Sequence, residues 1–419
     1  MIKFTSAILL IFNITILFAQ KRENIVDSLK YQKDLQGIIN TSFNRKFFDT
    51  LDRRHLNWFV LPLAIYNKNI GFSPGLVSFG GKTFGDPANT QFSIINTGAF
   101  ISISGLPTVK LRHNIFTSGD HWNFVGNYLI GRTVAIDNGT GTGSKSESDG
   151  NFTLNNAVFD NNAAAFPIRY TYFILNERAY RKIAKYLYAG AGFGFDVYHN
   201  IIDPAIGSIT RDHDYRYSIR NGYQPVGYSA NGLLFNFQYN SRDQTNRPYK
   251  GIYADLVLKV NQEWLGSEHD AKQLKVELRK YWSLSKKNPE TVLAFWSWSD
   301  FLLSGKIPYL DLPGTRSDDY GRDGRGYVMG RFKGLSFVYN EAELRYPVTE
   351  NKLLSAVAFV NEETADNQNK VKLFQYWEPG AGAGFRLLFN KYTRSNLCID
   401  YARGNYGANG LFLGVNEVF

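Results

Sequence analysis

The feature that most constrains this chain is a strict alternation of apolar side chains with polar or very small ones. It runs through residues 186–198 (YLYAGAGFGFDVY), 231–240 (NGLLFNFQYN) and 273–281 (QLKVELRKY). Successive residues of a β-strand point to opposite faces of a sheet, so alternation over stretches of this length predicts strands with one apolar and one polar face. Strands of about ten residues separated by polar turns are typical of outer-membrane β-barrels.

A secreted, soluble β-sandwich is the alternative, because its strands alternate as well. Lys275, Glu277 and Arg279 share one face of their predicted strand, and inward-pointing charges fit a water-filled lumen better than the packed core of a sandwich. We therefore predict an all-β fold, a transmembrane antiparallel β-barrel. The chain from Asn57, where the first clear strand begins, to Phe419 accommodates about sixteen strands with their connections.

The N-terminal part predicts export and contributes no domain of its own. A positive residue, a short apolar run and a small residue predict a signal peptide over residues 1–19. Residues 20–56 are charged and too few for a separate domain, and we expect them to form a short periplasmic segment before the barrel at 57–419. The only cysteine is Cys398, so no intrachain disulfide can hold the fold.

Composition and spacing exclude several classes of function. The net charge of +10 could indicate a nucleic-acid partner, but export argues against one. After the signal peptide no apolar run reaches the roughly 18 residues of a membrane helix. The six histidines are scattered without the spacing of metal ligands. We predict no enzymatic activity, no catalytic residues, no cofactor and no metal site.

The stretch 324–334 (GRGYVMGRFKG) places an arginine between two glycines, late in a long polar loop at 305–333. Gly324 and Gly326 allow backbone conformations that other residues resist. A phosphate-binding loop would need a helix to follow, and nothing helical is predicted after Gly334. Two interpretations stay open: an exposed loop with a solvated arginine, and a loop tip buried inside the barrel.

Three stretches, in this order, resemble the barrel of the BamA/TamA superfamily of outer-membrane assembly factors, the bacterial surface antigen family. Residues 239–253 (YNSRDQTNRPYKGIY) are similar to its Tyr-Asp-Ser-Arg-Asp…Pro-x-x-Gly segment, with Asn240 in place of the acid. Residues 324–334, followed by 337–347 (FVYNEAELRYP), are similar to its Arg-Gly-aromatic loop and the strand after it. Residues 380–404 (GAGAGFRLLFNKYTRSNLCIDYARG) are similar to its penultimate strands.

The resemblance implies that loop 305–333 folds back into the lumen, where its tip forms a latch. The latch residues are Gly324, Arg325, Gly326 and Tyr327, the lumen partners are Asp400, Glu341 and Glu343, and the wall glycines that leave room are Gly380, Gly382 and Gly384. Alternation independently points the three carboxylates inward, because their neighbours are apolar. An arginine inside a barrel needs such carboxylates, since an unpaired buried charge is costly.

The resemblance also implies a function, because the family's barrels insert or translocate other β-proteins through a weak seam between the first and last strands. Pro62 in the first strand cannot donate a ladder hydrogen bond, and Gly410 and Gly414 weaken the last strand. Phe419, the final aromatic, resembles the sorting signal of outer-membrane proteins.

We therefore expect a protein of the bacterial outer membrane, in contact with its lipid, that acts on β-barrel clients. Residues 20–56 are too few to hold periplasmic receptor domains, so we expect a short form that works with a separate periplasmic or membrane protein partner. The alternative is an outer-membrane pore or structural barrel with no client-handling activity.

Overall fold

The computed structural model describes most of the chain from residue 31 onward. The described residues are 31–42, 56–67, 71–143, 152–154, 157–159, 166–202, 212–368 and 370–419. The expected signal peptide (1–19) and most of the expected periplasmic segment (20–56) lie outside them. Residues 33–419 form one structural unit, and all interactions described below lie within it.

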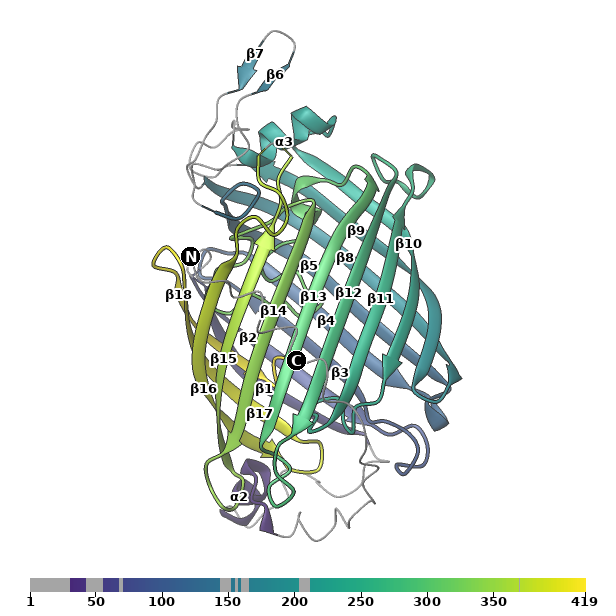
Figure 1. Ribbon diagram of the computed structural model, residues 1–419, viewed down its shortest axis with the longest axis vertical. Coiled ribbons are helices and arrows are strands. Elements are labelled where there is room, and N and C mark those ends of the chain that lie inside the picture. The colour runs from purple at the N-terminus through teal and green to yellow at the C-terminus, as the bar shows by residue number, and fades with distance from the viewer. Residues whose placement is uncertain are drawn as a thin grey trace. The chain divides into compact units, whose positions relative to one another are not determined.

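Sixteen strands form one antiparallel sheet in which each strand pairs with the next sheet strand along the chain (Figure 1). They are β1 (Asn57–Asn67), β2 (Gly71–Lys82), β3 (Ser93–Ile101), β4 (Pro107–Phe116), β5 (Trp122–Asp137), β8 (Phe166–Ala184), β9 (Leu187–Ile202), β10 (Gly227–Asn240), β11 (Gly251–Asn261), β12 (Ala271–Ser283), β13 (Val292–Gly305), β14 (Ser336–Pro347), β15 (Leu354–Ala365), β16 (Glu378–Asn390), β17 (Ser395–Gly404) and β18 (Asn409–Val415). The short strands β6 (Phe152–Leu154) and β7 (Ala157–Phe159) form a separate hairpin between β5 and β8. The predicted antiparallel barrel of about sixteen strands is confirmed.

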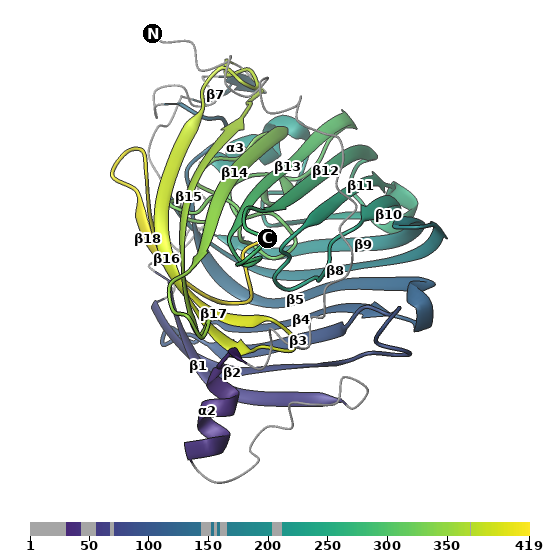
Figure 2. The ribbon, with the colours of Figure 1, turned by 60° about the horizontal axis from the view of Figure 1, so that its bottom comes forward.

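The sheet ends at β1 and β18. Among the described residues, β1 pairs only with β2, and β18 pairs only with β17. β1 has 11 residues and β18 has 7. Figure 2 shows the sheet curling so that the purple first strands and the yellow last strands come to the same side. The wall is therefore continuous except at one seam, where its two edge strands share no backbone hydrogen bonds within the described part of the chain.

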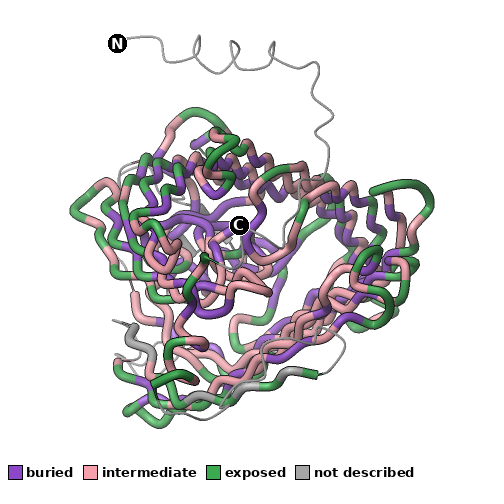
Figure 3. Tube along the Cα trace, turned by 90° about the horizontal axis from the view of Figure 1, so that it is seen from below, coloured by how far each residue is buried: buried purple, intermediate pink, exposed green. Residues whose placement is uncertain are grey.

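Alternation decides which side chains face outward. Phe193 and Phe235 lie on the outer face of β9 and β10 and are 42% and 49% exposed, whereas Tyr188 and Asn236 on the same strands point inward and are buried. Seen from below (Figure 3), the wall strands alternate between buried and exposed residues, and largely buried chain segments lie inside them. An apolar outer face of this kind matches a lipid environment.

The helices are few and short. α2 (Leu35–Ser42) packs against β16, at the end of the wall opposite to α3 (His213–Asn221) (Figure 1). α3 begins where the side chain of Asp212 accepts the N–H of Tyr215, and it ends at Gly222 in a left-handed conformation (φ 85°). The 3-10 turns are η3 (Ser118–Asp120), η5 (Glu263–Leu265) and η6 (Tyr309–Asp311). No helix in the described ranges is long and apolar enough to cross a membrane.

The connection between β13 and β14, which we call the interior loop (residues 306–335), folds into the lumen. Near its start, apolar side chains of the loop pack against inward-facing aromatic and aliphatic side chains of the wall. This cluster includes Ile307, Tyr309 and Leu312 of the loop with Ile168, Tyr198 and Tyr228 of the wall. The Tyr217 hydroxyl of α3 donates to the carbonyl of Ile307 at 3.0 Å. The loop is thus held inside the barrel by apolar packing before the chain reaches its tip.

The last residues, 416–419, which we call the tail, also leave the wall. Alternation predicts a final strand that runs to Phe419, but β18 ends at Val415, and the strand prediction is wrong for the tail. Asn416 adopts a left-handed conformation (φ 68°) that turns the chain. Phe419 is 3% exposed and stacks on the ring of Trp296, with 5.3 Å between ring centroids.

The interior loop holds the tail by its backbone. The guanidinium of Arg322 donates to the carbonyl oxygens of Val415, Glu417 and Val418. The carbonyls of Glu417 and Val418 lie beyond the end of β18, where the ladder offers no partner. Loop and tail therefore form one assembly inside the barrel.

We expect Phe419→Ala to lower the free energy of unfolding by about 3 kcal/mol, because truncating a buried Phe removes apolar contacts and leaves a cavity. Phe385→Ala is the matched control, since Phe385 is 58% exposed on the outer face of β16. Denaturant titrations in nonionic detergent, read from the mobility of unheated samples on gels, measure both. Equal losses for the two variants would show that the inward position of the tail contributes nothing to stability.

Candidate functional site

Arg325 sits at a sharp bend of the interior loop between two glycines with positive φ. The φ angles are 65° at Gly324 and 114° at Gly326, both in the left-handed region that favours glycine. A Cβ at Gly326 would also lie 3.0 Å from the carbonyl oxygen of Arg403 on β17. The two glycines let the loop reverse direction while its backbone stays against the wall, which aims Arg325 at the inner face.

The guanidinium of Arg325 contacts all three predicted carboxylates. Its Nε donates to Glu341 at 3.1 Å and its Nη2 donates to the other oxygen of the same carboxylate, while Nη2 also donates to Glu343 at 2.6 Å. Its Nη1 donates to Asp400 at 2.8 Å. The guanidinium carbon lies 3.4 Å from the ring centroid of Phe359. Arg325 is 2% exposed, so these charge-assisted bonds compensate for the loss of water around a full charge.

Further charged residues extend these contacts into what we call the charge network. Its members are Arg247, Arg325, Arg345 and Arg386 with Glu341, Glu343, Asp400 and Glu417. Arg386 is a second centre, because it donates to Asp400 at 2.5 Å and to Glu417 at 2.7 Å. Equal numbers of arginines and carboxylates make the network neutral as a whole. Removing one member would leave an uncompensated charge in a buried place.

The three stretches that resemble the BamA/TamA superfamily meet in the charge network. The first contributes Arg247, whose Nε lies 3.2 Å from an oxygen of Glu417. The second contributes Arg325 and the third contributes Asp400, 2.8 Å apart. Segments far apart in the sequence thus supply opposite charges to one place.

The three wall glycines of β16 lie where side chains would collide with the site. A Cβ at Gly384 would lie 1.9 Å from an oxygen of Asp400, and one at Gly380 would lie 2.9 Å from the carbonyl oxygen of Arg325. A Cβ at Gly382 would come within 2.4 Å of the aromatic ring that stacks on the guanidinium. The glycines therefore make room for the carboxylate, the loop backbone and the stacked ring.

Tyr327 fixes the other side of the loop tip. Its hydroxyl donates to the carbonyl of Pro379 at 2.6 Å and accepts the N–H of Asn405 at 2.8 Å. In addition, the side chain of Asn361 on β15 donates to the carbonyl of Arg325 at 2.9 Å. The tip is therefore tied to β15, to β16 and to the connection that follows β17.

The carboxylates also set the charge state of the arginine. Burial alone would lower the pKa of Arg325, but Glu341 and Glu343 outweigh burial, and the pKa lies above its ordinary value. The guanidinium therefore carries its full charge at every pH at which the protein folds.

The residues predicted for the seam are not gathered with the latch. Pro62 lies opposite Leu76 in the ladder between β1 and β2, and Gly410 and Gly414 lie on β18. A side chain at Gly414 would meet nothing within 4 Å. Phe419 lies apart from them, in the interior. The seam and sorting roles of these residues stay predictions.

Sequence reasoning omitted Arg247, Arg386 and Glu417 from the site. Arg386 could have been found, because the alternation that points Asp400 inward on β17 points Arg386 inward on β16. In the sequence, Glu417 is only a charge that interrupts the apolar face of the expected last strand. The structure gives the reason, because the chain turns at Asn416 and leaves the wall before Glu417. Arg247 lies in the turn between β10 and β11, where alternation predicts no direction.

The charge network consists of arginines and carboxylates alone. Residues 71–75 (GFSPG) have the Gly-x-Ser-x-Gly spacing of esterases, but they lie inside β2 rather than at a turn from strand to helix, as a nucleophile elbow requires. The described part of the chain contains no group of three or more His, Cys, Asp or Glu residues that could hold a metal ion.

We expect Arg325→Ala to lower the free energy of unfolding by about 3–5 kcal/mol, because it leaves buried carboxylates without a partner. The loop tip should loosen, so that a protease cuts within residues 311–323. Arg325→Lys should recover only part of the loss, since an ammonium group cannot fork across two oxygens. Unfolding in detergent and limited proteolysis measure these effects.

The control for this prediction is Arg403→Ala. Arg403 is an exposed arginine on β17, and its guanidinium contacts only the Tyr401 side chain. It should leave stability nearly unchanged, as surface substitutions usually do. If Arg325→Ala proved as mild as Arg403→Ala, the latch interpretation would be lost.

A second buried ion pair joins the interior loop to the wall near η6. Lys259 of β11 lies 2.5 Å from Asp196 of β9 and 3.4 Å from Asp311 of the loop. Burial, opposed by Lys259 and reinforced by Asp196, raises the pKa of Asp311 to about 7. One lysine therefore pairs with two carboxylates. The raised pKa belongs to Asp311, the carboxylate of the interior loop.

This arrangement predicts a pH dependence. Because the pKa of Asp311 is higher in the folded state than the roughly 4 of an unfolded chain, the folded state binds the extra proton, and stability should fall as the pH rises from about 4 to about 7. Asp311→Asn should remove this slope, whereas Asp270→Asn, at an exposed position, should keep it. The midpoints of denaturant unfolding at pH 5 and pH 8 measure this pH dependence. An equal change of the midpoint in wild type and in Asp311→Asn would exclude the Asp311 carboxyl as the source of the pH dependence.

Comparison with known proteins agrees with this geometry. The Omp85 superfamily domain matches residues 141–403, which is more than half of the chain. The chain is similar to the crystal structure of BamA from Haemophilus ducreyi lacking POTRA domains 1–3, with a TM-score of 0.52 and 14% identity over 87% of this chain and 69% of that one. It is also similar to CdiB from Acinetobacter baumannii, with a TM-score of 0.47 and 9% identity over 86% of this chain and 59% of that one. No curated protein matches the chain.

The likeness to BamA, at such low identity, concerns the fold. The domain match is independent of it, and it covers Arg247, Arg325 and Asp400, which the three resembling stretches bring together in the charge network. The family predicted from the sequence is thereby confirmed: the chain belongs to the Omp85 superfamily.

Proposed function

We propose that this Omp85 protein lies in the bacterial outer membrane and inserts or translocates other β-proteins through the seam between β1 and β18. The observation that carries the proposal is the unpaired state of these two edges in the described part of the chain. In hydrocarbon, each unsatisfied backbone polar group costs several kcal/mol. An open edge in a membrane therefore favours the addition of another strand, which is a general mode of recognition.

The distribution of interactions inside the barrel supports opening at this place. The charge network ties together β14, β16 and β17 through Glu341, Arg386 and Asp400, and no described residue of β1 belongs to it. A movement of β1 away from β18 would leave every member of the charge network paired. The wall can therefore open at the seam without breaking the buried ion pairs.

The composition of the edge strands supports the same proposal. Pro62 has no N–H to offer to a neighbouring strand, and it lies in β1, which is an edge strand. Gly410 and Gly414 lie in the seven-residue strand β18, and glycine inside a strand weakens it. We propose that these residues keep the seam weak enough to exchange its partner.

A passive pore or a purely structural barrel is the alternative. The interior holds the interior loop, the charge network and the tail, which together oppose free flow through the lumen. We also propose that clients reach the seam with the help of a separate periplasmic or membrane protein partner. Single-channel recording separates the two functions, because a pore predicts a steady open conductance and an assembly factor does not.

The seam is tested by locking it. In a Cys398→Ser background, one cysteine is placed within residues 57–66 and one within 410–418, for example Val60→Cys with Leu413→Cys, and the two are joined by a flexible bismaleimide. We expect the locked protein to lose the ability to speed the folding of a small reporter β-barrel into liposomes, followed by the mobility of unheated samples on gels.

The matched control joins Ala191→Cys and Phe235→Cys, which are register partners on β9 and β10. This crosslink leaves the seam free and should leave reporter folding unchanged. A locked seam that works as well as the unlocked protein would rule out lateral opening as the mechanism.

A further inference from the structure

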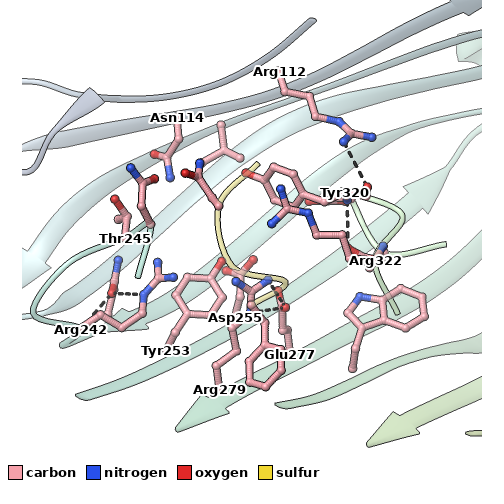
Figure 4. A pocket seen from close by; sticks show the side chains of 18 of the residues that line it. Arg112, Asn114, Arg242, Thr245, Tyr253, Asp255, Glu277, Arg279, Tyr320 and Arg322 are labelled. Carbon is pink, nitrogen blue, oxygen red and sulfur yellow. Dashed lines mark hydrogen bonds and ion pairs between the residues drawn. The ribbon is translucent and has the colours of Figure 1, made fainter. Parts of the chain in front are cut away.

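A cavity of about 120 Å³ lies inside the wall between the interior loop, the tail and strands β3–β5, β8 and β10–β13 (Figure 4). Residues of the turn between β10 and β11 line it as well, among them Arg242 and Thr245. A water molecule needs only about 10–15 Å³ of such space. The cavity therefore has room for a polyatomic ion together with some of its water.

The carboxylates that line this cavity are already engaged. Asp255 and Asp319 both pair with Arg178, and Glu277 pairs with Arg279 at 2.5 Å. The remaining two face other groups: Asp318 accepts backbone N–H groups of the interior loop, and Glu417 belongs to the charge network. No lining carboxylate is left over to neutralise a further cation.

Three arginines that line the cavity form no ion pair with a carboxylate within the described part of the chain: Arg112, Arg242 and Arg322. Asp319 and Asp318 act on Arg112 and Arg322 only at longer range. Arg112 and Arg322 both lie against the same aromatic side chain, with their guanidinium carbons 5.3 and 5.1 Å from the ring centroid of Tyr320. Figure 4 shows Arg112, Tyr320 and Arg322 together on one side of the cavity, with Arg242 on the other side. Two like charges, each on a partly buried side chain, thus face the same end of the cavity.

The two arginines keep free donors beside the cavity. Arg112 donates through Nε to Asn127 at 2.8 Å and through Nη1 to the carbonyl of Tyr320 at 3.2 Å, so its Nη2 has no acceptor among the described residues. Arg322 uses both Nη atoms on the tail, and its Nε likewise has none there. Burial lowers the pKa of Arg322, and the charge of Arg112 acts in the same direction.

We propose that this cavity binds an oxyanion of the phosphate class between Arg112 and Arg322. Guanidinium groups suit phosphate oxygens because their planar donors match them in pairs, and an anion there would cancel the repulsion between the two arginines. The phosphate can be free or can belong to the head group of an anionic phospholipid, since both present the same oxygens.

The bound anion would add a connection between the wall and the interior loop beside the hydrogen bond from Arg112 to the carbonyl of Tyr320. Arg112 belongs to β4, whereas Arg322 belongs to the interior loop and holds the tail. An anion between them ties the early wall to the interior assembly. This inference does not depend on client insertion, and it would stand if the seam proved to be inactive.

The test is a titration of the full-length protein in nonionic detergent with inorganic phosphate, against chloride at the same ionic strength so that screening is equal. We expect phosphate to raise the Tm of wild type, and Arg112→Gln to weaken the affinity at least tenfold, which corresponds to about 1.4 kcal/mol. Arg403→Gln, an exposed control, should respond as wild type does. Equal phosphate responses in wild type and Arg112→Gln would overturn the proposal.

A second reading separates binding from a structural role. Without phosphate, the Tm of Arg112→Gln reports what the hydrogen bonds of Arg112 to Asn127 and Tyr320 contribute to stability. A variant that starts from a lower Tm but gains as much from phosphate as wild type does would show a structural role without binding. Arg112→Lys, which keeps the charge but loses the fork, should bind phosphate with intermediate affinity and serves if the Gln variant fails to fold.

The source of the phosphate is decided in vesicles. If a lipid head group is the source, phosphatidylglycerol in phosphatidylcholine vesicles should raise the Tm of wild type more than that of Arg112→Gln, and added free phosphate should raise it no further. If free phosphate is the source, phosphatidylglycerol should have no effect, and free phosphate should act as it does in detergent. No response to either source would end the proposal.

Discussion

The buried contact between Arg325 and its three carboxylates is the interaction on which the interior of this barrel depends. A guanidinium at 2% exposure is stable only where opposite charges replace water, and here those charges come from β14 and β17. Because the charge network is neutral only when complete, each contributing segment stabilises the others. The turn between β10 and β11, the interior loop, β16 and the tail are therefore coupled through electrostatics, although they are far apart in the sequence.

Because of this coupling, some strands of the wall are held by more interactions than others. Strands β14, β16 and β17 are linked by the charge network inside the barrel as well as by the ladder of the wall, whereas the described residues of β1 contribute only the ladder to β2. A membrane protein that opens its wall must confine the opening to one place, because every broken ladder bond in lipid is costly. Under the proposed function, the charge network on one side of the seam would confine the opening to the seam.

Much of this arrangement could be predicted from the sequence, because the alternation of apolar and polar residues indicates both where a strand lies and which of its side chains point into the barrel. It predicted the antiparallel barrel, and it placed Asp400, Glu341 and Glu343 on the inner face. It failed at Phe419, where one left-handed residue turns the chain, and it could not assign Arg247, because turns have no period. The arginines of the cavity could not be predicted for a similar reason. Alternation indicates that Arg112 points inward, but only the fold shows which charged side chains form no ion pair.

The glycines of β16 have a further consequence for how the strands align. A strand whose inner face carries Gly380, Gly382 and Gly384 offers little by which its neighbours could recognise the correct register, since a slip of two residues presents almost the same surface. The seated loop tip removes that ambiguity, because a slipped β16 would bring Glu378 or Arg386 to a place that only a glycine can occupy. The seated loop tip thus favours the observed register of β16 against β15 and β17.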